Sequence, residues 1–142
     1  MTDLDLPDVN VLVALLHPQH AFHRLAGDWF AATDRFCTTP LTSAGFLRVA
    51  LNPTVMGAVL SAADVLASLR SLEGDARWEL LADDTALTRP VIDLSGIVGP
   101  KQVTDLHLVN LVAQAKGRLI TLDRKIKPTL LPNEQQLVRC LL

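Results

Sequence analysis

The chain has 142 residues, of which 49% are hydrophobic, and its formal net charge is −2. This length suits one core, so we expect a single domain over residues 1–142, and the apolar composition excludes a disordered chain. The slight negative charge argues against a protein that holds nucleic acid by bulk positive charge, but leaves open one that meets phosphate through bound cations.

Strand and helix patterns alternate along the first half of the chain. The expected elements are a strand over residues 3–8, a short helix over 9–16, an amphipathic helix over 20–33, a strand over 35–39 and a helix over 41–51. Pro7 fits poorly in a central strand because proline removes a ladder donor. The Asn52-Pro53 pair should end the last of these helices.

The second half repeats the alternation. The expected elements are a helix over residues 61–73, strands over 77–82, 118–123 and 136–142, and a helix over 102–117. The pattern over residues 85–98 is undecided, with a helix broken near Pro90 as one interpretation. The whole order favours an α/β domain with a mostly parallel sheet covered by helices on both faces.

Three acids fall where functional groups gather in such folds, at the carboxyl ends of the strands. Asp8 ends the first strand, Asp123 ends the strand over 118–123, and Asp105 opens the helix that leads into it. Taken singly, each has an ordinary structural interpretation: a helix cap for Asp8, a helix-dipole contact for Asp105 and a turn residue for Asp123.

Taken together, three converging carboxylates would repel one another and raise their pKa values unless something neutralised them. A hard divalent cation would do so, and carboxylate oxygens with water suit Mg²⁺ or Mn²⁺. No Ser–His–Asp or Cys–His set is present in the sequence to support nucleophilic catalysis instead.

Three stretches carry a resemblance to a known family: LPDVNVLVALLHPQHAFHRLAGDWF, TTPLTSAGFLRVALNP and VTDLHLVNLVAQAKGRLITLDRKI. In this order they resemble a PIN domain, and more narrowly the VapC-type toxin of VapBC toxin–antitoxin modules. The resemblance covers essentially the whole chain. It implies a PIN-like α/β/α sandwich with a five-stranded parallel sheet.

The resemblance also implies a function, that of a metal-dependent endoribonuclease. Asp8, Asp105 and Asp123 match the family's catalytic and metal-binding acids, Asn10 the asparagine that steadies the first of them, and Thr121 a hydroxyl near the last. Such an enzyme hydrolyses RNA phosphodiesters through a metal-activated water, with Mg²⁺ or Mn²⁺ as cofactor. The implied partners are the RNA substrate, a cognate VapB-type antitoxin and a second copy of the chain.

One position departs from the family's pattern. Ser43 stands where many PIN domains carry a glutamate, and a serine supplies no negative charge. We therefore expect one well-held cation, with a second site weak or absent until RNA phosphate joins. A weakened PIN fold that mainly binds RNA or antitoxin is the alternative. Asp83 and Asp84 follow the strand over 77–82 and have two interpretations. They replace the missing carboxylate at the metal site, or, as we favour, they belong to an acidic surface loop.

Several basic residues lie near these motifs. Arg48 has two interpretations, a contact to phosphate or to an active-site acid and a solvated helix charge. Arg124, Lys125 and Lys127 follow Asp123 directly, as a basic lip that would hold an RNA backbone or as a solvated turn.

Two further patterns receive mainly structural interpretations. His17, His20 and His23 would build part of a transition-metal site on a regular helix, but Pro18 interrupts them and no acid or cysteine completes the set. We favour the interpretation that these histidines lie on the surface at the start of a helix. A minor role for them near the path of the RNA stays open. Trp29 and Trp78 are interpreted as core residues.

The sequence also argues against export and membrane insertion. Its apolar runs are far too short to span a bilayer, and the N-terminal MTDLDLPD carries acids where a secretory signal has basic residues. Cys37 and Cys140 lack metal-ligand spacing and a C-x-x-C pattern, so we interpret them as reduced thiols in a cytoplasmic protein.

Overall fold

The structure, a computed structural model, describes residues 3–142 and contains a five-stranded sheet in which all paired strands are parallel. The strand order is β3-β2-β1-β4-β5. The strands are β1 (Leu4–Pro7), β2 (Phe36–Thr38), β3 (Trp78–Leu80), β4 (Gly117–Thr121) and β5 (Val138–Cys140). The predicted parallel α/β class is therefore confirmed, although every strand is shorter than its sequence pattern.

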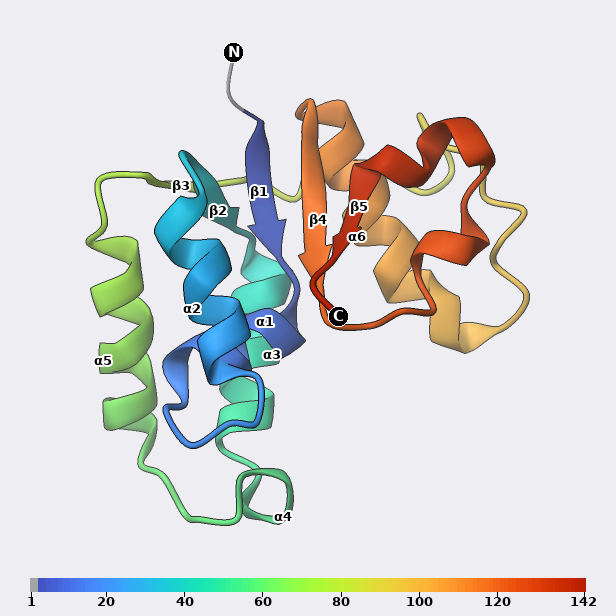
Figure 1. The fold of residues 1–142 in the computed structure, drawn as a ribbon. Helices are drawn as coiled ribbons and strands as arrows, with labels where there is room; N and C mark the ends of the chain where they lie inside the picture. Colours follow the sequence, from blue (N-terminus) through green and yellow to red (C-terminus); the bar gives the residue numbers. More distant parts are fainter. Residues whose placement is uncertain (1–2) are drawn as a thin grey trace.

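Helices cover both faces of the sheet. They are α1 (Val9–Leu16), α2 (His23–Ala32), α3 (Pro40–Ala50), α4 (Pro53–Met56), α5 (Ala62–Glu73) and α6 (Val103–Gln114), with short 3₁₀ turns at Pro100–Gln102, Lys127–Thr129 and Pro132–Leu137. Figure 1 shows α2, α3 and α5 on one side of the strands and α6 on the other. This is the expected α/β/α sandwich.

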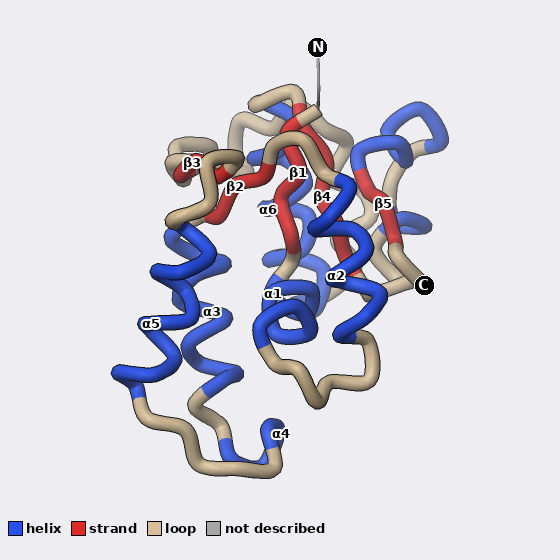
Figure 2. The backbone as a smooth tube through the Cα atoms, turned by 60° about the vertical axis from the view of Figure 1, so that its left-hand side comes forward, coloured by secondary structure: helices blue, strands red, loops and turns tan. Residues whose placement is uncertain are grey.

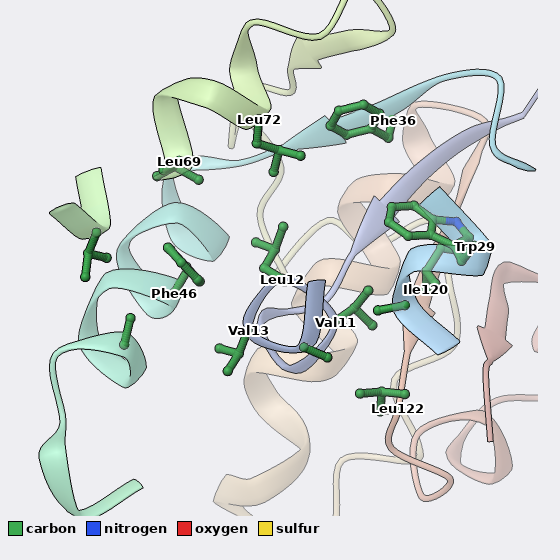
Figure 3. Packing of buried hydrophobic residues seen from close by; sticks show 14 residues of the cluster. Val11, Leu12, Val13, Trp29, Phe36, Phe46, Leu69, Leu72, Ile120 and Leu122 are labelled. Carbon is green, nitrogen blue, oxygen red and sulfur yellow. The ribbon is translucent and has the colours of Figure 1, made fainter. Parts of the chain in front are cut away.

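The alternation of side chains along the strands explains the two layers. On β4, Leu119 packs with α6, whereas Ile120 packs with α1 and α2. The larger core, seen from close by in Figure 3, gathers Leu12, Trp29 and Phe36 with residues of α3 and α5. Since central strands are covered twice, their apolar residues form two separate clusters, one for each face.

Proline at the end of the central strand is tolerated because of the local register. Pro7 is the last residue of β1, whose pairing with β2 registers only Asp5 with Phe36. The next amide, that of Asp8, donates to the carbonyl of Ile120 on β4 over 2.8 Å. The chain therefore continues the β4 ladder just past the proline and then turns into α1.

Residues 85–98 form no regular helix or strand, so the helix considered for this stretch is wrong. Tertiary contacts hold the segment instead. The Asn110 side-chain oxygen accepts the Val91 N–H at 2.8 Å, and a Cβ at Gly96 would come within 2.1 Å of the Thr129 carbonyl oxygen. The segment is therefore fixed by the buried Asn110 of α6 and by a close backbone approach that only glycine permits.

The short helix α4 was not predicted. The Asn52-Pro53 pair that ends α3 also starts α4, because the Asn52 side chain accepts the Thr54 N–H and Pro53 occupies the first turn.

The sequence predicts no membrane-spanning segment and two reduced cysteines. No helix within residues 3–142 is long and apolar enough to cross a bilayer. Cys37 and Cys140 are both free thiols, and burial raises the pKa of Cys37 to about 12.

Candidate active site

The fold brings the three predicted acids to one cavity. Asp8 follows β1 and caps α1, Asp105 lies in the first turn of α6, and Asp123 comes two residues after β4. All three line the same depression. They meet because β1 and β4 are neighbouring parallel strands whose carboxyl ends share one edge of the sheet.

Thr121 organises the hydrogen bonds between them. Its hydroxyl donates to Asp8 Oδ2 over 2.9 Å and accepts the Asp123 N–H at 3.0 Å. The Asn10 amide donates to the same hydroxyl oxygen at 3.3 Å, while its own oxygen accepts the Leu122 N–H at 3.1 Å. Asn10 therefore supports Asp8 through Thr121 rather than by direct contact.

The remaining oxygen of Asp8, Oδ1, accepts the Val9 N–H at 2.8 Å. The capping interpretation of Asp8 is thus correct, and it is compatible with a second role. A carboxylate oxygen has two lone pairs, so each oxygen that accepts one hydrogen bond can still face a ligand in the cavity.

The pKa values of Asp8 and Asp105 are both raised in this cluster. Burial raises the pKa of Asp8, against the lowering effect of its hydrogen bonds to Thr121 and Val9, and the charge of Asp123 raises it further. Burial likewise raises the pKa of Asp105 to about 6, with added contributions from Asp8 and Asp123. The three carboxylates therefore repel one another at neutral pH.

The three acids fit a hard divalent cation, because they offer carboxylate oxygens and a negative charge that a cation would relieve. Within residues 3–142, no three His, Cys, Asp or Glu side chains stand close enough together to hold a metal ion as they are. The acids thus share a cavity without forming a tight cage.

Of the two predicted site residues on α3, Arg48 lines a cavity with Asp8 and Ser43 does not. An adjoining cavity is lined by Asp8 together with Thr42, Gly45 and Arg48. Ser43 is half-buried in the first turn of α3, which contains no acid, and it is not among the residues lining this cavity. Arg48 is exposed and forms no ion pair with any residue in 3–142, so it is free to meet a ligand.

A third cavity is bordered by two of the three acids. It is lined by Asp105 and Asp123 together with Lys101 and Lys125. Arg124 and Lys127, also predicted as RNA contacts, are exposed but do not line it. Sequence reasoning missed Lys101. Its position four residues before Asp105, where α6 begins, was the available signal.

Asp83 and Asp84 do not join the site. Asp83 lies 2.9 Å from the His107 ring and so links the segment after β3 to α6. Asp84 lines a separate cavity with Leu111 and Gln114. Neither one replaces the carboxylate that Ser43 lacks.

The tryptophans pack inside the fold as interpreted. Trp29 is buried and donates to Asp5, and Trp78 is half-buried and donates to Thr38.

Comparison with known proteins assigns the family. No family model matches the chain, but individual relatives do. The chain is 43% identical to ribonuclease VapC38 of Mycobacterium tuberculosis over 123 residues, which cover 83% of this chain and 84% of the relative. The chain belongs to the VapC ribonuclease family. Within the family it is also 36% identical to VapC39 over 121 residues, 83% of this chain and 87% of the relative, from the same organism.

A third M. tuberculosis member of the VapC family, ribonuclease VapC44, is 34% identical over 131 residues, which cover 89% of this chain and 91% of the relative. The match thus extends over most of both chains. The resemblance inferred from the sequence is confirmed at the level of the family.

Proposed function

We propose that this protein is a metal-dependent endoribonuclease and the toxin of a VapBC-type toxin–antitoxin module. One observation carries the proposal: Asp8, Asp105 and Asp123 line a single cavity at the carboxyl edge of the sheet, in a member of a ribonuclease family. The substrate class is RNA, and the reaction is hydrolysis of a phosphodiester bond.

The residues have distinct roles in this proposal. Asp8, Asp105 and Asp123 would hold Mg²⁺ or Mn²⁺, which when bound supplies an activated water and stabilises charge on the phosphate. Thr121 orients Asp8 by donating to it. Lys101 and Lys125, which line a cavity with Asp105 and Asp123, would meet the RNA backbone, and Arg48 would do so from the adjoining cavity that Asp8 lines.

The proposal is tested by Asp8→Asn. Asparagine caps a helix as well as aspartate does, so α1 should stay intact while the ligand charge is lost. Purified wild-type protein with Mg²⁺ or Mn²⁺ should cut RNA, and Asp8→Asn should lower the rate at least about a hundredfold, on the scale of lost metal ligands. The exposed Asp84→Asn is the matched control and should cut normally. Equal cutting by Asp8→Asn would refute the mechanism.

A second function, binding without catalysis, is favoured by Ser43, because the first turn of α3 carries no acid. Calorimetric titration with Mn²⁺ separates the two functions. Binding that Asp8→Asn abolishes supports the nuclease. Absence of binding at millimolar Mn²⁺, with and without RNA, would support the binding module. Tighter binding by Ser43→Glu would measure what the missing carboxylate costs.

We further infer a cognate VapB-type antitoxin, a homodimer and a cytoplasmic location. Exposed apolar side chains near α4 support protein partners, since Val55 is 61% and Val59 is 87% exposed. Light scattering of the purified chain should give the mass of a dimer. A reading frame for a small DNA-binding protein directly upstream of the gene, whose product copurifies with this chain and blocks RNA cutting, would identify the antitoxin.

A further inference from the structure

His20 lies at the candidate active site although it is remote in sequence from Asp105 and Asp123. It belongs to the loop that joins α1 to α2, seen in Figure 2 at the end of these helices away from β1. The half-buried imidazole lines the same cavity as Asp8, Asp105 and Asp123. Val13, Val49 and Val55 also line this cavity and are apolar.

The hydrogen bonding of His20 fixes which ring nitrogen carries the proton. Nδ1 lies 3.0 Å from the backbone N–H of Phe22. A peptide N–H only donates, so Nδ1 must accept, and the neutral ring then carries its proton on Nε2. An imidazolium would place a second hydrogen against that N–H. The geometry therefore favours a neutral ring with an Nε2–H donor.

The surroundings agree with a neutral ring. Burial, followed by the nearby His17 and His23, lowers the pKa of His20. A protonated Nε2 has no lone pair for a metal, so in this state His20 is a donor and not a further ligand. Within residues 3–142, Nε2 has no hydrogen-bond partner. A free donor thus stands beside the site where a substrate anion is expected.

We propose that His20 binds the RNA strand by donating Nε2–H to a non-bridging phosphate oxygen. This inference rests on the proposed function, because it needs RNA held over the acids. The other two histidines of the predicted trio have different places. The His23 Nδ1 bonds the Ala14 carbonyl at 2.9 Å, and His17 is not among the residues lining the cavity with the acids. The transition-metal interpretation of the trio therefore fails, and His20 alone takes a role on the RNA path.

Two substitutions separate the donor from the local structure. In His20→Asn the side-chain oxygen can still accept the Phe22 N–H, as Nδ1 does, but nothing replaces Nε2–H. In His20→Gln the longer side chain carries an amide N–H toward the Nε2 position. His17→Asn is the matched control, since it makes the same chemical change on the same loop outside the cavity.

The measurement is cleavage of a fluorophore–quencher oligoribonucleotide pool of random sequence with Mn²⁺, at about pH 7 and about pH 8, where an unperturbed histidine is already mostly neutral. His20→Asn should raise KM about tenfold with kcat nearly unchanged, on the scale of a hydrogen bond to a charged group. His20→Gln should recover most of the affinity. His17→Asn should match wild type, and all variants should unfold at the wild-type temperature.

Three results would overturn the inference while leaving the nuclease intact. The first two are a wild-type KM for His20→Asn and equal losses for His20→Asn and His20→Gln. An effect of His20→Asn that fades between about pH 7 and about pH 8 would also overturn it, because it would assign the contact to an imidazolium facing Asp8, Asp105 and Asp123. Failure of the wild-type protein to cut RNA at all would instead refute the proposed function.

Discussion

A single hydroxyl, that of Thr121, connects most of the residues proposed for catalysis. It is fully buried, donates to Asp8 and accepts from Asn10 and Asp123. Without it, one carboxylate oxygen loses its donor and two N–H groups lose their acceptor. Positioning of the first acid therefore depends on a residue from another strand, far away in sequence.

Replacing Thr121 by valine should damage stability and activity together. Valine keeps the shape but leaves buried polar groups unpaired, which should cost about 2 kcal/mol of unfolding free energy. Misplacement of Asp8 should lower kcat/KM by about tenfold or more. Thr121→Ser keeps the hydroxyl and should retain most activity. Denaturant unfolding and RNA cleavage check both outcomes, and equal activity of the two variants would contradict the role given to the hydroxyl.

Asp105 makes stability depend on pH in the cation-free protein. Its pKa rises from 3.8 to about 6 in the folded state, so the folded protein binds this proton more tightly than the unfolded chain does. Stability from this group is therefore lost as pH rises through that interval. Asp105→Asn should unfold at a higher temperature than wild type near pH 7 in EDTA, and the gap should shrink near pH 4. A difference in unfolding temperature that grows as the pH falls would contradict a raised pKa for Asp105 in the folded state.

At the scale of elements, β1 is joined to the layer beside it by a buried carboxylate. Asp5 is 2% exposed and accepts from Trp29 of α2 and from Thr33 at 2.8 and 2.9 Å. On its other oxygen, Arg118 of β4 donates over 2.8 Å. Asp5 thus ties two strands and one helix together on the face opposite Leu4 and Leu6.

Removing this carboxylate should destabilise the fold without touching the chemistry. Asp5→Ala leaves the buried Trp29 N–H and the half-buried Arg118 guanidinium without their acceptor, and an unsatisfied buried donor costs about 2 kcal/mol. Asp3→Ala, an exposed acid two residues earlier, should change little. Urea unfolding compares them, and equal midpoints would show that the buried network adds no stability.

Long periodic helices were predicted well, because their stability follows from local pattern and caps. Ser61 accepts the Asp64 N–H at 3.1 Å and Gly74 follows the last turn, as expected for α5. Residues 85–98 were not predictable, since Asn110 and the close approach at Gly96 fix them. Their structure depends on contacts outside the segment.

For the whole molecule, the formal net charge of −2 implies that RNA is met at a few places rather than by a basic surface. Lys125 lines the cavity beside Asp105 and Asp123, whereas Lys127 does not. A comparison of substitutions at these two lysines therefore separates a local contact to RNA from a general electrostatic attraction of RNA.

Lys125→Gln should weaken RNA binding more than Lys127→Gln, although both remove one charge. In an Asp8→Asn background with Mn²⁺, the slope of log K against log salt should flatten by about 0.7 for Lys125→Gln, the value for one single-strand phosphate contact. Fluorescence anisotropy over a range of salt concentrations checks this. Identical effects of both substitutions would mean that only the overall charge matters.

The sequence by itself determined the order of the strands and of the longer helices, the parallel α/β class and the candidate acids, because hydrophobic period, caps and turn residues act locally. Tertiary structure decided what surrounds the acids. The Thr121 hydrogen bonds, the cavity shared with His20 and the place of Lys101 arise where chain segments distant in sequence meet at one sheet edge. Such meetings depend on strand order and loop paths, which no local pattern encodes.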